Sequence, residues 1–257
     1  MMNNKKGLIR VGRIRYHGNK MLIPKLDGYK TIVVMMKSHS KWYPLSPYEL
    51  KNNKGQIMEN IYQFSKVYKK VPKSKQRYSK FNNTIIWEWP EEVHVDKNCT
   101  LTPEYWEWRE AGTNNRYAVR YPVGFRHRGE VLYSIKGYPD GTYSFPLDYI
   151  NARKEIYIPE YSGLVKKEDK FKELKRLLNN KSENLLIVEV DGPHQESLDY
   201  YKDTYGVDNN FIMDHTMLIN RKNIKIMLND PKHNFGHGYV LAMTLLDKEK
   251  KWGKFRF

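Results

Sequence analysis

The sequence predicts a mixed α/β protein folded as a single compact domain, with a central sheet surrounded by helices. Short runs rich in β-branched residues alternate with segments whose apolar residues recur at helical spacing. The run at 185–190 is apolar except for Glu189, as in a strand that is buried on both faces. The 257 residues, of which 40% are hydrophobic and 14% aromatic, suffice to bury a sizeable core.

Periodicity places the regular elements in chain order. Residues 1–28 are basic and broken by glycine and proline, so we expect a basic arm or short strands there. Strands are expected at 29–36, 84–89, 116–121, 131–135 and 185–190. Helices are expected at 58–69, 105–111, 146–157, 167–179, 216–228 and 238–246.

Turn and capping residues mark where several elements begin and end. Thr102 before Pro103 is a helix-start signal, and Gly112 is the expected stop. Residues 139–141 (Pro-Asp-Gly) predict a turn, because proline presets φ and glycine accepts a positive φ. Loops are expected at 42–48, 73–80 and 191–215, the last with a short helix, and a mobile basic tail at 248–257.

Cysteine and histidine usage excludes two kinds of site. Cys99 is the only cysteine, so an intrachain disulfide and a thiolate zinc cage are impossible. His233 and His237 stand four residues apart but lack an obvious third ligand, and we expect neither a metal nor a cofactor. No run approaches the roughly 18–20 apolar residues of a membrane span, and no apolar segment follows the N-terminus. We expect an intracellular, cytoplasmic protein that does not bind membranes.

The chain is strongly basic, with a formal net charge of +16. Such a field attracts nucleic acid or phosphorylated ligands, although an AT-rich coding bias also favours lysine. The aromatic and basic stretch 103–128 could stack bases and hold phosphates, or it could supply core aromatics with arginines that face solvent. Nucleic acid is therefore one possible partner.

The predicted helix at 58–69 sorts polar residues from apolar ones. Glu59, Gln63 and Lys66 stand at i, i+4 and i+7 and fall in one stripe at helical pitch. The apolar residues on the opposite side are Ile57, Ile61, Phe64 and Tyr68. The polar stripe is either a chemical face or a solvated face with loose ion pairing.

Together with the preceding loop, this stripe carries a resemblance to a known family. Residues 45–48 (Leu-Ser-Pro-Tyr) are followed by Glu59, Tyr62, Gln63 and Lys66, in the pattern Glu-x-x-Tyr-Gln-x-x-Lys. This resembles the opening signature of the NADAR superfamily, N-glycosidases related to proteins of the riboflavin pathway. Pro47 stands where that family usually has asparagine.

Weaker similarities continue along the chain. Residues 230–238 before the last helix are similar to the closing segment of the family, with Phe235 in place of its usual tryptophan. The middle of the family is resembled by 151–154, 171–178 and 185–189. The resemblance implies a NADAR-like domain at 29–247 with an aromatic and basic insertion around 84–135.

The function implied by the resemblance is hydrolysis of the N-glycosidic bond of an ADP-ribosyl or phosphoribosyl adduct. Lys66 would be the amine nucleophile, because a lysine whose pKa is lowered by burial can form a Schiff base with ribose. Glu59 would be the acid/base, since a carboxylate beside the anomeric carbon can move a proton or stabilise an oxocarbenium ion. The substrate contacts would be Ser46, Tyr62, Gln63, Glu189, Asp230, Phe235, Gly236 and Gly238.

Among these contacts, Gln63 would orient the sugar and Asp230 would contact the ribose. Residues 235–238 would contact phosphate or base. Gly236 and Gly238 would let backbone amides approach a phosphate at a helix N-terminus, although glycine also serves any tight turn.

Two other functions stay open. Glu189 and Asp191 end a predicted strand on one face and could hold Mg²⁺ in a nuclease. The restriction-type core expects Glu-x-Lys there, and Asp191 also suits the turn that Gly192 begins. The second alternative is a non-catalytic nucleic-acid-binding protein on the same fold, in which Lys66 would have no catalytic role.

Overall fold

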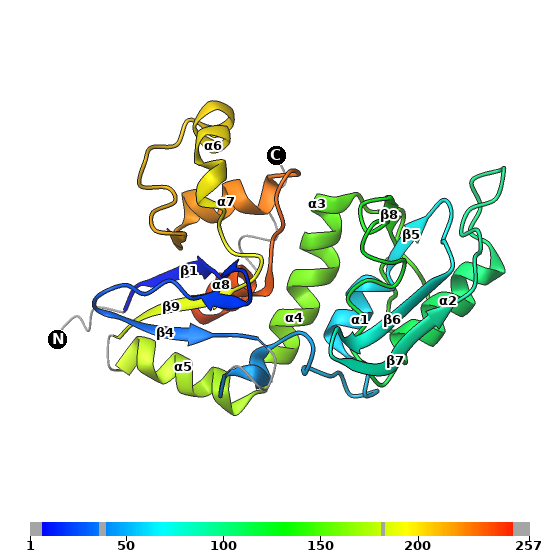
Figure 1. Cartoon of the computed structure of the whole chain (residues 1–257), viewed down its shortest axis with the longest axis horizontal. Helices are drawn as coiled ribbons and strands as arrows, with labels where there is room; N and C mark the ends of the chain where they lie inside the picture. Colours follow the sequence, from blue (N-terminus) through cyan, green and yellow to red (C-terminus); the bar gives the residue numbers. More distant parts are fainter. Residues whose placement is uncertain (1–6, 36–39, 181–182, 249–257) are drawn as a thin grey trace. The chain divides into compact units, whose positions relative to one another are not determined.

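The computed structural model describes residues 7–35, 40–180 and 183–248 and shows a mixed α+β protein, as predicted. The chain divides into two compact units, residues 1–46 with 161–257 and residues 47–160. Figure 1 shows the first unit in blue and in yellow to red, and the second in cyan to green. Each unit has its own sheets, and no sheet in the described part of the chain takes strands from both.

The first unit is built on a four-stranded sheet with the order β10-β1-β9-β4. Its strands are β1 (Ile9–Arg13), β4 (Tyr29–Val33), β9 (Asn184–Glu189) and β10 (Thr216–Leu218). β9 lies between β1 and β4 and is parallel to both, whereas β10 is antiparallel to β1. The side chains of 185–188 are fully buried, which confirms the central strand predicted there.

Helices complete the first unit. They are α5 (Asp169–Asn180), α6 (Leu198–Tyr205), α7 (Arg221–Asn229) and α8 (His237–Leu245), and β2 (Arg15–His17) pairs with β3 (Lys20–Leu22). α8 packs against β1 and β9 (Figure 1), and its residues 238–245 are all buried. The short turn Gln195–Ser197 leads directly into α6.

The second unit contains two strand pairs and an aromatic core. β5 (Lys66–Tyr68) pairs with β8 (Val131–Ser134), and β6 (Ser74–Ser79) pairs with β7 (Asn82–Trp89). Its helices are α1 (Met58–Gln63), α2 (Pro103–Thr113), α3 (Tyr149–Ala152), a π-helical turn (Arg153–Tyr157) and the start of α4 (Ile158–Val165). Phe64, Tyr68 and Trp108 are fully buried in this core.

The predicted helix at 58–69 is wrong in its second half. α1 ends at Gln63, Phe64 and Ser65 turn the chain, and Lys66 begins β5. The β-branched Val67 pairs with β8 and is fully buried, so tertiary pairing overrides the helical spacing.

The expected strand at 116–121 is absent, and the segment is irregular, with bends at 116, 117 and 120. Its backbone N–H groups are bonded by side-chain amides instead of a neighbouring strand. Val119 N donates to Asn60 Oδ1 at 2.8 Å, and Tyr121 N donates to Gln76 Oε1 at 3.0 Å.

Three more predicted elements need correction. The exposed loop at 73–80 is the hairpin strand β6, the helix at 216–228 begins only at Arg221, and that at 146–157 continues through the π-turn into α4.

The capping prediction at α2 is confirmed at its start only. Thr102 Oγ1 accepts a hydrogen bond from Tyr105 N at 3.3 Å, but the helix continues past Gly112 to Thr113. A Cβ at Gly112 would overlap the ring of Phe64, so this glycine serves close packing and not helix termination. The turn at 139–141 is confirmed, with Gly141 at φ +85°.

The first residues of the basic arm (1–6) and most of the basic tail (249–257) lie outside the described residues. Among the helices that are described, none has the length and apolar character to cross a membrane.

Candidate active site

The polar stripe predicted on the first helix forms a chain of hydrogen bonds in the second unit. Lys66 Nζ donates to Gln63 Oε1 at 2.7 Å, and Gln63 Nε2 donates to Glu59 Oε1 at 2.9 Å. The expected helix does not produce this grouping, since Lys66 lies on β5. The turn after α1 returns the chain instead, with Ser65 Oγ donating to Tyr62 O at 2.8 Å.

Burial changes the chemistry of this chain. Glu59 is 6% exposed. Burial lowers the pKa of Lys66 to about 8, although the Glu59 carboxylate opposes the change. At neutral pH roughly a tenth of such an amine is unprotonated, against well under a thousandth of an ordinary lysine. Lys66 is therefore the kind of amine that can act as a nucleophile.

The ring of Tyr62 lies beside the amine. Lys66 Nζ lies 4.8 Å from the centre of the Tyr62 ring, and Tyr62 packs on Tyr157 with ring centres 4.8 Å apart. Burial and then Tyr149 raise the pKa of Tyr62 well above its usual range, against the lowering effect of Arg153. Tyr62 therefore keeps its hydroxyl proton and can donate a hydrogen bond to a ligand.

Arg153 in the π-turn acts electrostatically on Tyr62, but the sequence analysis assigned it no role. Arg153 is 1% exposed, and its guanidinium lies 4.0 Å from the centre of the Tyr149 ring. π-Helical turns recur at functional sites. The signal available in the sequence was an arginine in the middle segment of the family resemblance, but nothing in its spacing showed that it would be buried.

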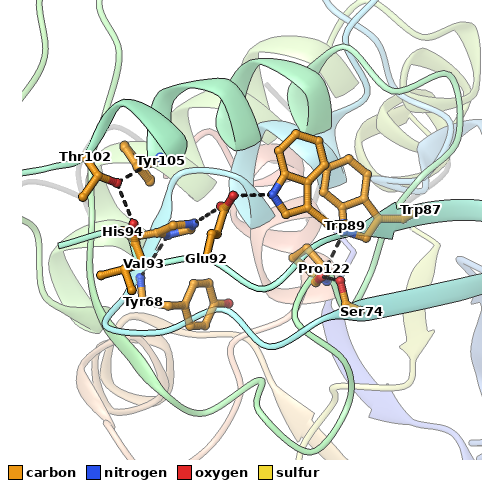
Figure 2. A network of polar contacts seen from close by, with 10 residues as sticks. All are labelled: Tyr68, Ser74, Trp87, Trp89, Glu92, Val93, His94, Thr102, Tyr105 and Pro122. Atoms are coloured by element: carbon orange, nitrogen blue, oxygen red, sulfur yellow. Dashed lines mark hydrogen bonds and ion pairs between the residues drawn. The ribbon is translucent and has the colours of Figure 1, made fainter. Parts of the chain in front are cut away.

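A network around His94 fixes the strand that carries Lys66 (Figure 2). Tyr68 N donates to His94 Nδ1 at 3.4 Å, and His94 Nε2 donates to Glu92 Oε1 at 2.8 Å. Glu92 Oε2 in turn accepts from Trp89 Nε1 at 2.6 Å. β5 is thus held by β8 on one edge and through Tyr68 by this network, which sets the position of Lys66 two residues earlier.

The other predicted contacts belong to the first unit, where Glu189 fills the expected phosphate position. Glu189 is fully buried, and its Oε1 accepts from Gly238 N at 2.6 Å, at the start of α8. A Cβ at Gly236 would overlap this carboxylate, and one at Gly238 would lie 2.7 Å from Oε1. The two glycines therefore admit the protein's own anion at the helix N-terminus. Their predicted role as phosphate contacts is corrected accordingly, as is that of Glu189 as a substrate contact.

His237 completes this buried arrangement. Its Nδ1 lies 2.9 Å from Glu189 Oε2, and its Nε2 donates to Val34 O at 3.0 Å. Burial lowers the pKa of His237, but Glu189 and the Val34 carbonyl outweigh this and raise it above the usual value. Glu189 and His237 form an ion pair that joins the end of β9 to α8.

Phe235 and Ser46 are also internal to the first unit. Phe235 is 6% exposed and stacks on Tyr239, with ring centres 5.0 Å apart. Ser46 is fully buried beside the short turn Tyr43–Leu45, and its N–H donates to Tyr43 O at 2.9 Å. Both side chains are buried, and their roles as substrate contacts stay predictions.

Asp230 is saturated by donors from its own unit. It is fully buried and accepts hydrogen bonds from the hydroxyls of Tyr200, Tyr201 and Tyr205, from the Lys232 backbone N–H and from His233 Nδ1. Burial raises the pKa of Asp230, but these donors outweigh it and hold the pKa below its usual value. A ribose contact would have to displace one of these donors, so the ribose role of Asp230 stays a prediction.

The carboxylates expected to bind Mg²⁺ in a nuclease, Glu189 and Asp191, have hydrogen-bond or ion-pair partners within the protein. Asp191 accepts from Asn234 Nδ2 at 3.1 Å, whereas Glu189 is paired with His237. Within residues 7–35, 40–180 and 183–248, no group of three or more His, Cys, Asp or Glu side chains could hold a metal ion.

The stretch 103–128 divides between core and surface. Tyr105 and Trp108 are fully buried, as the core interpretation predicted. Arg116 lies 4.8 Å from the centre of the Tyr117 ring, and Arg128 lies 3.7 Å from that of Phe125, which is 57% exposed. The surface part thus presents cations stacked on aromatic rings.

No protein-family model, curated protein or solved structure matches the chain. The resemblance to the NADAR superfamily therefore remains a prediction.

Proposed function

We propose that the second unit carries an N-glycosidase site for an ADP-ribosyl or phosphoribosyl adduct, with Lys66 as the amine nucleophile. The observation that supports this proposal best is the Lys66 amine itself. Burial lowers its pKa to about 8, and Gln63 and Glu59 hold it by successive hydrogen bonds. An exposed ion pair would neither lower the amine pKa nor fix the amine in one direction.

In the proposed reaction, Lys66 Nζ bonds to the anomeric carbon as the bond from that carbon to the base breaks. The base leaves with the electron pair. The Glu59 carboxylate takes up the proton that the attacking amine loses and passes it to the base. Opening of the sugar ring gives a Schiff base on Lys66, and water then hydrolyses it to release the sugar and the free amine.

Gln63 and Tyr62 have supporting roles in this proposal. Gln63 uses its carbonyl on Lys66 and its amide on Glu59, so it fixes the distance between nucleophile and acid/base. The protonated Tyr62 hydroxyl is a donor for a sugar hydroxyl or phosphate oxygen. Arg153 adds a permanent buried cation, which favours a substrate that carries phosphate.

The first test compares turnover by Lys66→Ala and Lys75→Ala on a panel of ADP-ribosyl and phosphoribosyl N-glycosides, including NAD⁺. Lys75 lies on β6, pairs with Glu88 and is about half exposed, so its removal should leave turnover unchanged. Lys66→Ala should abolish turnover while the circular dichroism spectrum stays that of the parent protein. Equal turnover by the parent and Lys66→Ala would refute the amine mechanism.

A second candidate function is supported by the stacked cations at 116–128. Exposed Phe125 with Arg128 above it offers both a stacking ring and a phosphate contact. A nucleic-acid-binding protein should lose affinity steeply as salt rises, with a slope of about −0.7 to −0.9 for each phosphate contact. Binding with a steep salt slope that survives Lys66→Ala, without glycosidase activity, would favour this function over the first.

A further inference from the structure

The first unit contains a hydrogen-bonded chain of serine, histidine and aspartate that the glycosidase proposal does not use. Ser197 Oγ lies 2.9 Å from His233 Nε2, and His233 Nδ1 lies 2.6 Å from Asp230 Oδ2. Asp230 at the C-terminal end of α7 and His233 just after it are three residues apart, whereas Ser197 comes from the turn before α6. The fold therefore brings Ser197 to this pair, and no local spacing in the sequence indicates that contact.

The partners of His233 fix the direction of its protons. The Asp230 carboxylate only accepts, so His233 Nδ1 carries the proton that it donates. With Nδ1 protonated, Nε2 of the imidazole has a lone pair toward Ser197 and can accept the hydroxyl proton. This is the arrangement by which a histidine activates a serine as a nucleophile.

Burial differs among the three residues of this hydrogen-bonded chain. Asp230 is fully buried, and the His233 side chain is 10% exposed and packs beside the rings of Tyr200 and Tyr201, whose centres lie 5.1 and 5.0 Å from its own. Ser197 is partly exposed. The carboxylate is thus protected from water, the imidazole packs against two aromatic rings, and the residue that carries the hydroxyl is partly exposed.

Ser197 also precedes α6 directly, and its side chain does not cap that helix. A serine in this position usually bonds the N–H groups of the first turn. Here the hydroxyl is directed to His233 instead. The first-turn N–H groups of a helix, and its positive end, favour negative charge that develops nearby.

We propose that Ser197, His233 and Asp230 form a second site, which hydrolyses carboxylic esters. Ser197 Oγ attacks the ester carbonyl carbon, and its proton passes to His233 Nε2. The ester C–O bond then breaks, the alcohol leaves with that proton, and the acyl group stays on Ser197. Water, deprotonated by His233, hydrolyses the acyl-serine and restores the free hydroxyl, so that ester and water give acid and alcohol.

The other role for the same contacts is a structural one, in which they tie α6 to the segment after α7. That role needs the hydrogen bonds but gives Ser197 no unusual reactivity. The reactivity of the hydroxyl therefore separates the two.

The experiment treats the full chain with a fluorophosphonate, which phosphonylates activated serines, and locates the adduct by peptide mass spectrometry. We expect the adduct on Ser197, with its formation slowed at least about 100-fold in His233→Gln, because a positioned general base contributes about 10² to 10⁴ in rate. Hydrolysis of p-nitrophenyl acetate should fall in parallel in Ser197→Ala. Ser79→Ala, a change in the β6–β7 hairpin of the other unit, is the control and should match the parent.

Peptide mapping of the parent protein keeps the test decisive even where a variant fails to fold. An unmodified Ser197 in the folded parent, or an adduct that forms equally fast in a folded His233→Gln, would overturn the proposal and leave the structural tie.

Discussion

Gly112→Ala tests whether close packing at one backbone position holds the candidate active site in place. A Cβ at Gly112 would overlap the ring of Phe64, which is fully buried. The ring centres of Trp108 and Trp87 lie 4.5 and 4.8 Å from that of Phe64, so the ring has no room to retreat. Ordinary carbon contacts need about 3.5 Å, which requires a displacement of about 1.5 Å.

Overpacking of this kind typically costs about 1–3 kcal/mol, and the urea midpoint of unfolding should fall accordingly. Phe64 lies between Gln63 and Lys66 in sequence, so turnover should also fall. Gly163→Ala is the matched control, because Gly163 lies in α4 with open space where a Cβ would stand. That change should stabilise by roughly 0.5–1 kcal/mol through helix propensity. A Gly112→Ala protein as stable as the parent would refute the packing argument.

Two further predictions concern titration and the buried ion pair. Turnover needs the unprotonated Lys66 amine, so the pH profile should rise with pH and level off above about 8, which is checked by initial rates from pH 6 to 9. A profile that is flat between pH 6 and 9 would contradict the amine role. His237→Gln leaves the buried Glu189 without its cation and should cost about 3–5 kcal/mol in urea unfolding, whereas His127→Gln at an exposed pair should cost under about 1 kcal/mol. The pKa of His237 is raised in the folded protein, so its ion pair contributes fully to the free energy of unfolding at pH values below the ordinary histidine pKa. This contribution is lost as the pH rises through the raised pKa. Equal losses of stability in His237→Gln and His127→Gln would contradict a stabilising pair.

The sequence predicted the elements whose signals are local. The run at 185–190 is the central strand because continuous burial leaves the same apolar pattern in any such strand. The start of α2 was predictable because Thr102 acts within one turn of itself. Signals of this kind need no knowledge of distant partners.

The secondary-structure and site predictions were wrong where contacts with residues distant in sequence determine the local structure. Val67 pairs with β8, more than sixty residues away in sequence, and this pairing ends the predicted helix. Val119 has its N–H bonded by Asn60, so a segment with strand-like composition runs as a loop. The role of Glu189 depended on the contact with Gly238, which no spacing reveals.

The candidate site shows both outcomes. The sequence grouped Glu59, Gln63 and Lys66, and the structure brings them together by a turn and a strand instead of a continuous helix. The sequence did not predict a site role for Arg153, because the burial of its side chain depends on the packing of the π-turn.

The most direct test of the amine mechanism is borohydride trapping during turnover of an ADP-ribosyl N-glycoside. Reduction of a Schiff base would fix the sugar irreversibly on the amine that formed it. The account predicts the added mass on the peptide that contains Lys66, and its loss in Lys66→Arg, which keeps the charge but cannot form the imine. An active enzyme that shows no adduct on Lys66, or an adduct that persists in Lys66→Arg, would contradict it.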